Sequence, residues 1–208
     1  MAGIDSLRTL LVEQLKDIYD AETRLTKAIP KLARKSTNDE LKEAFQHHLR
    51  ETEEHVSRIE QAFEELDLSP KARACVGMKG LIEEGDEHAG EAYDHDGLRD
   101  AAIIGAAQRV EHYEIAAYGT AIAHAKLLEL DKIVSLLEET LVEEKAADRT
   151  LTDIAESAVN LDAESPEERK VSTRRLSGRR GIVMMRPAGS QRAAAADRSR
   201  RTSRRRRR

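Results

Sequence analysis

The stretch HHLRETEEHV, residues 47–56, places metal-binding side chains in the middle of an otherwise apolar helical pattern. His48, Glu51 and His55 are three and four residues apart, so their side chains project from roughly the same side of a helix. Burying such groups without partners would cost several kcal/mol. The stretch therefore predicts either a solvated helix face or a face that lies against a cation. The apolar residues that surround these three at helical spacing are Leu41, Ala44, Phe45, Leu49, Val56, Ile59 and Phe63.

Four long segments of the chain carry the 3.6-residue apolar period of amphipathic helices. The one that contains residues 47–56 is expected to be helical over about residues 38–66. Thr37 and Glu40 at its start have the spacing of a capping box. The other three helices are expected over about residues 5–35, 97–127 and 131–159.

The links between these segments differ in length, which indicates how the helices are connected. The first and third links are short, so each joins two helices into an antiparallel hairpin, whereas residues 67–96 form a long connection between the hairpins. Residues 71–92 within this connection are periodic enough to predict a short extra helix. The expected fold is all-α: a ferritin-like four-helix bundle of two antiparallel hairpins joined by a long crossover that contains a short extra helix.

The composition is typical of a helical protein without a membrane segment. Only 3% of the residues are aromatic, tryptophan is absent, and Ala, Leu, Glu, Lys and Arg are abundant. No run approaches the length of about 18 apolar residues that a membrane span needs, and charged residues interrupt the N-terminal segment where a signal peptide would be apolar. We therefore expect a soluble, cytoplasmic protein. The single cysteine, Cys75, excludes an internal disulfide and a cysteine-based zinc cluster.

The charges are divided between an acidic body and a basic C-terminal segment. Residues 169–208 hold 16 of the 35 Lys and Arg residues but only one of the 39 acidic residues, Asp197. This segment is rich in Arg, Ser, Ala and Gly and has no sustained apolar period. We expect a bundle domain over residues 1–163 and a disordered, Arg-rich tail over residues 164–208. Such a tail, without aromatic residues for stacking on bases, is expected to bind nucleic acid, or the acidic surface of other proteins, without sequence preference.

Glutamate residues also interrupt the apolar pattern on the other three long helices. Glu22 does so on the first, Glu111 and Glu114 on the third, and Glu144 on the fourth. At a rise of about 1.5 Å per residue, Glu22 and Glu51 lie at one level of the first hairpin, and Glu114 and Glu144 lie at one level of the second. Carboxylates packed together without a cation would repel one another and raise their pKa values. Two divalent cations would relieve this repulsion, and oxygen and imidazole ligands suit iron or manganese.

Five segments, which together span about residues 5–160, carry a resemblance to a known family: LVEQLKDIYDAETRLTKAIPKLA, ELKEAFQHHLRETEEHV, GLIEEG, VEHYEIAAYGT and LLEETLVEEKAADRTL. In these segments the chain resembles the YciE/YciF-type stress proteins of the ferritin-like superfamily. The resemblance implies a four-helix bundle with an extra helix, a homodimer, a relationship to rubrerythrins and a ferroxidase-type role. It also implies a metal pattern of Glu on the first and third helices and Glu-x-x-His on the second and fourth.

The sequence departs from this metal pattern on two helices. Thr52 stands three residues before His55, so the nearest match on the second helix is Glu51-x-x-x-His55. On the fourth helix, the residue that corresponds to the histidine after Glu144 is Ala147 or Asp148. One clear histidine ligand therefore remains. Carried over residue by residue, the resemblance implies metal ligands at Glu22, Glu51, His55, Glu111, Glu114, Glu144 and Asp148.

The function expected from these residues is oxidation of Fe(II) by O2 or H2O2 at a site for two iron ions, with manganese as the alternative metal. Glu51 and Glu144 are expected to bridge the ions, and His48 is interpreted as a hydrogen-bonded core histidine. Two other functions remain open. One is a manganese catalase-like peroxide scavenger, and the other is a non-catalytic helical dimer that acts as a stress-related interaction protein.

Overall fold

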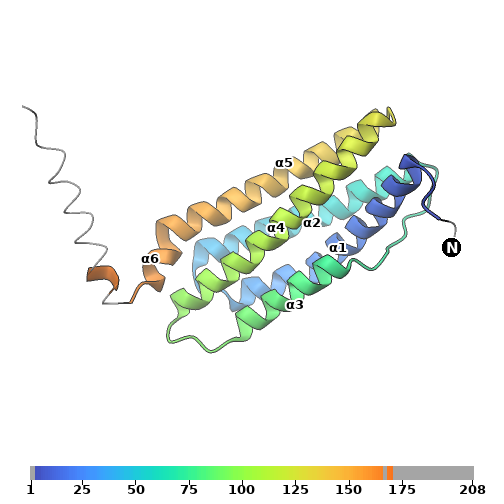
Figure 1. Ribbon diagram of the computed structural model, residues 1–208. Helices are drawn as coiled ribbons and strands as arrows, with labels where there is room; N and C mark the ends of the chain where they lie inside the picture. Colours follow the sequence, from blue (N-terminus) through green and yellow to red (C-terminus); the bar gives the residue numbers. More distant parts are fainter. Residues whose placement is uncertain (1–2, 166–167, 171–208) are drawn as a thin grey trace, which may run out of the picture. The chain divides into compact units, whose positions relative to one another are not determined.

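The computed structural model describes residues 3–165 and 168–170, and it confirms the all-α bundle (Figure 1). Met1–Pro166 form one compact unit, which contains every helix named below. The Arg-rich tail predicted for residues 164–208 lies almost entirely outside the described residues. The helices are α1 (Leu7–Lys35), α2 (Asp39–Glu64), α3 (Val76–Gly90), α4 (Asp96–Leu127), α5 (Asp131–Ile154), the π-helical turn η1 (Ala155–Val159) and α6 (Asn160–Ala163).

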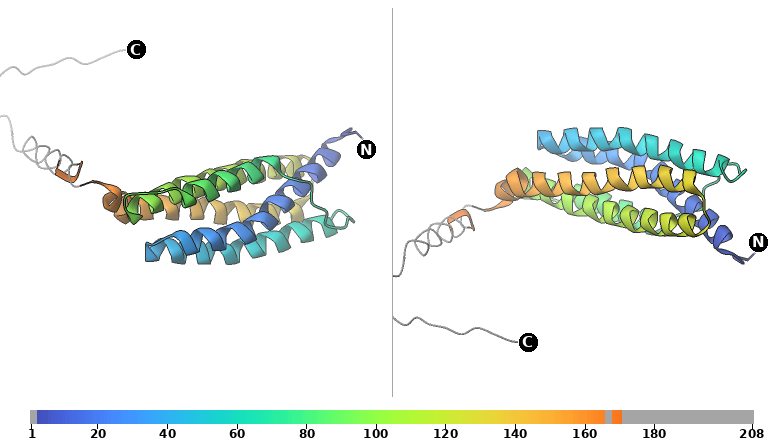
Figure 2. Two further views of the ribbon diagram at one scale, coloured as in Figure 1. Left: turned by 90° about the horizontal axis from the view of Figure 1, so that it is seen from below. Right: turned by 90° about the horizontal axis from the view of Figure 1, so that it is seen from above.

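The four long helices form two antiparallel hairpins, α1 with α2 and α4 with α5 (Figures 1 and 2). The hairpins pack together through α2 against α5 and through α1 against α4. The crossover helix α3 packs across α1 and α4 and contributes Met78 and Ala89 to the core. Among the described residues, the bundle contains no helix with the length and apolar character needed to span a membrane.

A layer of polar side chains divides the apolar core into two clusters. One cluster is built from the halves of the long helices near the α1–α2 turn, together with α3, and the other from the halves near the α4–α5 turn. Each long helix passes from one cluster to the other through buried polar residues. These residues of the polar layer are Glu22, His48, Thr52, His55, Glu111, Glu114, Thr140 and Glu144.

Asp100 of α4 joins the α1–α2 turn to the second hairpin. Its buried carboxylate accepts hydrogen bonds from the Thr37 N–H at 2.9 Å, the Thr37 hydroxyl at 2.7 Å and the Asn38 N–H at 2.7 Å. Asn38 is the N-cap of α2, and its side chain accepts a hydrogen bond from the Leu41 N–H. The predicted capping box of Thr37 and Glu40 is therefore wrong, because Thr37 donates instead to a carboxylate, which is the stronger acceptor.

The turn between α4 and α5 contains a residue in the left-handed conformation, Glu129, with φ of 56°. The N–H of Glu129 bonds to the carbonyl of Lys126, and the N–H of Leu130 bonds to the carbonyl of Ala125. This is the Schellman pattern, in which glycine is the preferred residue because it has no Cβ. The tight turn therefore requires some backbone strain at Glu129.

Candidate metal centre

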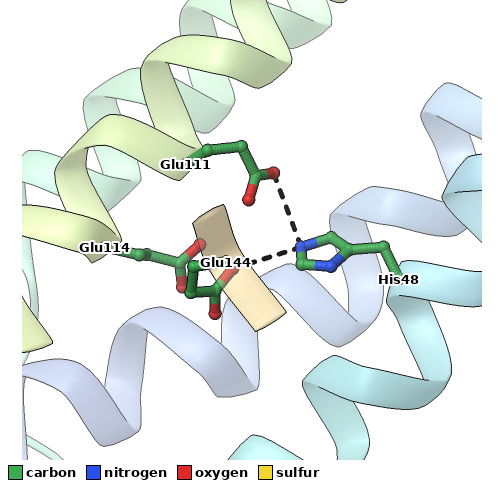
Figure 3. Close-up of side chains that lie close together, drawn as sticks. All are labelled: His48, Glu111, Glu114 and Glu144. Carbon is green, nitrogen blue, oxygen red and sulfur yellow. Dashed lines mark ion pairs between the residues drawn. The ribbon is translucent and has the colours of Figure 1, made fainter. Parts of the chain in front are cut away.

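Six buried residues of the polar layer form two groups that could each hold a cation. In each group, one nitrogen or oxygen atom per residue lies within 4.8 Å of the others. Figure 3 shows the larger group, whose four side chains come from α2, α4 and α5 and point toward one another. Glu144 belongs to both groups. Within the described residues the groups are His48, Glu111, Glu114 and Glu144, and Glu22, His55 and Glu144.

The periodicity of α2 turns both histidines toward the core. Buried residues follow one another along this helix at alternating intervals of four and three, which is the spacing of a stripe that faces a partner helix. Both histidines belong to this stripe, and apolar residues of the stripe precede and follow them. The stripe runs through Leu41, Phe45, His48, Thr52, His55, Ile59 and Ala62.

The imidazole of His48 presents one nitrogen to the interior and the other to the surface. Nε2 lies 3.4 Å from Oε1 of Glu111 and 3.7 Å from Oε2 of Glu144. Nδ1 lies 3.4 Å from Oε2 of the half-buried Glu51. Burial alone lowers the pKa of this imidazole, but the carboxylates of Glu111, Glu51 and Glu144 outweigh it and raise the pKa of His48 to about 9.

His55 also lies between carboxylates, and it approaches the other oxygen of Glu144. Its Nδ1 lies 2.9 Å from Oε1 of Glu144 and 3.6 Å from Oε2 of Glu22. Its Nε2 lies 2.9 Å from Oε2 of Glu143, a carboxylate that also binds the guanidinium of Arg58. Burial lowers the pKa of His55, but Glu144 and Glu22 outweigh it and raise the pKa to about 11. When a cation displaces the Nδ1 proton, an Nε2–H that donates to Glu143 keeps Nδ1 directed into the site.

A tyrosine fixes the carboxylate of Glu22. The hydroxyl of Tyr118 donates a hydrogen bond to Oε1 of Glu22 at 2.5 Å, and both side chains are fully buried. Burial, together with the charges of Glu22 and Glu144, raises the pKa of Tyr118 well above its ordinary value. The phenol therefore keeps its proton and holds Glu22 with Oε2 toward His55.

The site contains more acceptor atoms than the surrounding protein can satisfy. Seven buried side-chain atoms among the described residues have no partner in hydrogen-bonding geometry, although His55 Nδ1 and Glu144 Oε1 lie close enough for an ion pair, and all seven belong to this site. Burial raises the pKa of Glu22, and burial and neighbouring carboxylates raise the pKa values of Glu111 and Glu114 well above normal. These atoms are Glu22 Oε2, His55 Nδ1, Glu111 Oε2, both oxygens of Glu114 and both oxygens of Glu144.

Two arrangements can compensate such a cluster: protons shared among the carboxylates and histidines, or bound cations. Buried acceptors that converge without donors are the expected environment of a cation. The donor set of carboxylate oxygens and two imidazole nitrogens fits iron or manganese. The buried residues present therefore fit a metal ion.

Five of the seven metal ligands expected from the sequence are brought together by the fold. They are Glu22, His55, Glu111, Glu114 and Glu144.

The other two, Glu51 and Asp148, lie outside both groups. Oε2 of Glu51 contacts the imidazoles of His47 and His48 at 3.2 and 3.4 Å. Asp148 accepts a hydrogen bond from Gln108 at 3.2 Å. Neither carboxylate therefore belongs to the buried clusters, and their role as ligands stays a prediction.

From the sequence, His48 was placed on the same side of the helix as His55 but was interpreted as a hydrogen-bonded core histidine, and Glu143 was not selected. The interval of seven residues between His48 and His55 fits a strict four-and-three pattern on α2, which favours His48 over Glu51 as an inward-facing residue. Glu143 had no comparable signal, because its contacts with His55 and Arg58 cross from α5 to α2.

The comparisons with known proteins agree with this fold. A family described as "Domain of unknown function (DUF892)" matches residues 6–164. Protein YciF of Escherichia coli (strain K12) is 47% identical over 164 residues, which is 78% of this chain and 98% of YciF.

Solved structures give the same result. The crystal structure of the E. coli stress protein YciF matches with a TM-score of 0.72 and 46% identity, over 76% of this chain and 99% of that one. The protein YcfI from Rhodopseudomonas palustris matches with a TM-score of 0.70 and 46% identity, over 72% of this chain and 94% of that one.

Proposed function

The chain belongs to the DUF892 family and is a homologue of the stress protein YciF, and from this premise we propose that it is a two-metal protein that oxidises Fe(II). One observation carries the proposal. The two histidines approach different oxygens of Glu144: His48 Nε2 lies 3.7 Å from Oε2, and His55 Nδ1 lies 2.9 Å from Oε1. A carboxylate with one nitrogen ligand beside each oxygen is suited to bridge two cations.

The residues would divide between two metal positions. His48 with Glu111 and Glu114 would hold one ion, and His55 with Glu22 would hold the other. Glu144 would serve both. This assignment keeps Glu144 as a bridge, as the sequence predicts, and gives Glu51 a different task. Because Glu51 lies beside Nδ1 of His48, it orients that imidazole so that Nε2 faces the site.

The stoichiometry of Fe(II) oxidation follows from the number of electrons that each oxidant accepts. Two Fe(II) ions supply one electron each, and two electrons with two protons convert O2 to H2O2, or H2O2 to two molecules of water. The protein contributes position and environment. Tyr118 holds Glu22 in place, and the apolar clusters on either side of the polar layer exclude water.

This reaction suits a homologue of a stress protein. Free Fe(II) and peroxide are harmful together, and a site that consumes both removes the hazard. The proposal assigns this chemistry to the polar layer of the bundle and assigns no part of it to the C-terminal tail.

The test is the rate at which Fe(II) disappears in aerated buffer and with added H2O2, in the presence of the metal-free protein. We expect the wild type to oxidise Fe(II) faster than buffer does. Glu144→Gln keeps the shape of the side chain but removes its charge, and it should abolish the acceleration. Glu138→Gln, a surface change on the same helix, should have no effect. Equal rates for wild type and buffer would leave the interaction-protein function as the better explanation.

A further inference from the structure

A cleft between α2 and α5 connects the surface with the candidate metal centre. It has a volume of about 250 Å³ and reaches Glu111, whose side chain is buried. Its α5 wall is formed mainly by small side chains, including Ala146 and Ala147. The cleft is lined by Ala44, Phe45, His47, Glu51, Glu111, Ala146, Ala147, Thr150 and Leu151.

Three metal-binding side chains line this cleft, His47, Glu51 and Glu111, and His48 lies between Glu51 and Glu111. The exposed fraction of the side chain falls from 65% for His47 to 23% for Glu51, 8% for His48 and 4% for Glu111. Each lies beside the next. The distance from His47 Nδ1 to Glu51 Oε2 is 3.2 Å, from Glu51 Oε2 to His48 Nδ1 is 3.4 Å, and from His48 Nε2 to Glu111 Oε1 is 3.4 Å.

A second cavity, on the side of α3, reaches Glu111 as well and also His48, but its chemistry is different. It has a volume of about 30 Å³, and apart from His48, Glu111 and Asp86 its lining is apolar. A hydrated cation loses its water only where other oxygen or nitrogen atoms replace it, since unpaired charge in an apolar environment is costly. The cavity below α3 offers few such atoms, whereas the cleft between α2 and α5 offers them in sequence.

We propose that the cleft between α2 and α5 is the entrance through which divalent metal ions reach the site, with His47 and Glu51 as transit ligands. The inference rests on the proposed two-metal function. Glu51 and His47 replace part of the hydration shell near the surface, and His48 and Glu111 receive the ion at the inner end. The same geometry explains why Glu51 resembles a ligand in the sequence but lies outside the buried groups.

The experiment measures the rate of Co(II) uptake by metal-free protein, followed by the visible absorbance of Co(II) with nitrogen and oxygen ligands, together with the final number of ions bound. Ala147→Leu narrows the cleft, and His47→Gln removes the outer imidazole without touching the buried groups. The matched control is Ala117→Leu. Ala117 is also a half-buried alanine that lines a cleft, but that cleft lies elsewhere, with residues of α1 and α4 in its wall.

We expect Ala147→Leu to slow the rate of Co(II) uptake severalfold, because the larger side chain narrows the cleft. His47→Gln should also slow the rate of Co(II) uptake. Both variants should finally bind as many ions as the wild type, and Ala117→Leu should bind them at the wild-type rate. If all variants load at the wild-type rate, the entrance is wrong although the metal site stands. If the wild type binds no Co(II), the metal site and its entrance are both wrong.

Discussion

The imidazole Nε2 of His55 lies 2.9 Å from Oε2 of Glu143, and its Nδ1 lies 2.9 Å from Oε1 of Glu144, the next residue of α5. Two consecutive residues of one helix therefore contact the two nitrogens of one imidazole. Arg58 forms an ion pair with Glu143 and lowers the pKa of that carboxyl against the effect of burial, so that Glu143 stays charged. A metal-binding histidine commonly donates its other N–H to a carboxylate in this way.

Glu143→Ala is expected to weaken metal binding by about 10–100-fold, because it removes the acceptor that orients His55. The measurement is the equilibrium affinity for Mn(II) or Fe(II), determined in competition with a chelator. Glu139→Ala is the control, because Glu139 also binds Arg58 but does not contact His55. Equal losses of metal affinity in the two variants would show that the effect comes from the contacts of Arg58 and not from the orientation of the His55 imidazole.

The stability of the metal-free protein should fall as pH rises. The pKa values of Glu22, Glu111 and Glu114 are raised by burial, and those of His48 and His55 are raised to about 9 and about 11. The folded cluster therefore holds protons more tightly than the unfolded chain, and the free energy of unfolding decreases with pH. The carboxyl contribution is lost above the ordinary value of 4.5, and the histidine contribution is lost between 6.5 and about 9 to 11.

Urea unfolding at a series of pH values measures this dependence. With saturating metal the trend should reverse, because metal ligands must be deprotonated and a cation then takes the place of the shared protons. A metal-free protein whose stability is the same at pH 6 and pH 9 would contradict the proton-sharing cluster.

Asp100→Ala should destabilise the fold by about 2–3 kcal/mol, since it leaves the Thr37 and Asn38 donors without their charged acceptor. Metal binding should persist at a temperature where the variant is folded, because Asp100 and Glu111 are about 16 Å apart along α4 at the helical rise. Asp96→Ala removes an exposed carboxylate from the same helix and serves as the control. Similar unfolding free energies for the two variants would show that the α1–α2 turn does not depend on Asp100.

Glu129→Gly should stabilise the protein by about 1 kcal/mol, because glycine adopts the left-handed conformation without a Cβ clash. Thermal unfolding should show a higher melting temperature. Glu138→Gly, in the interior of α5, should have the opposite effect, since glycine is unfavourable within a helix. A lower melting temperature for Glu129→Gly would mean that the Glu129 side chain contributes more than the backbone strain costs.

The helices could be predicted from the sequence because their apolar periods are long and their turns are short. The segments expected over residues 97–127 and 131–159 correspond to α4 and to α5 with η1. The levels of Glu114 and Glu144 were also predictable, because counting residues from a tight turn fixes height in a hairpin. Glu144 therefore meets Glu114 as expected.

The inner face of α2 was harder to predict. His48 and Glu51 are both polar and stand only three residues apart in the sequence. An approximate helical period is therefore compatible with either of them as the residue that faces the core. The packing decides, because the buried stripe continues from Phe45 through His48 to Thr52 and leaves Glu51 on its edge. The contact between His55 and Glu143 depends on how α2 and α5 are placed against each other, which no local pattern encodes.

Two expectations concern partners and stay predictions. The homodimer follows from the family resemblance alone. Nucleic-acid binding was assigned to the Arg-rich tail, most of which lies outside the described residues. A protein that ends at residue 163 would show whether dimer formation and nucleic-acid binding depend on the tail.

The central claim is that two cations share Glu144, and the most direct measurement is the number of Fe(II) or Mn(II) ions bound per chain under anaerobic conditions. We predict two ions for the wild type and for Glu51→Gln, and fewer than two for Glu144→Gln, because a neutral amide cannot bridge two cations as a carboxylate does. A wild type that binds no metal at micromolar concentrations, or a Glu144→Gln variant that binds two ions as tightly as the wild type, would contradict a site in which Glu144 is shared by two cations.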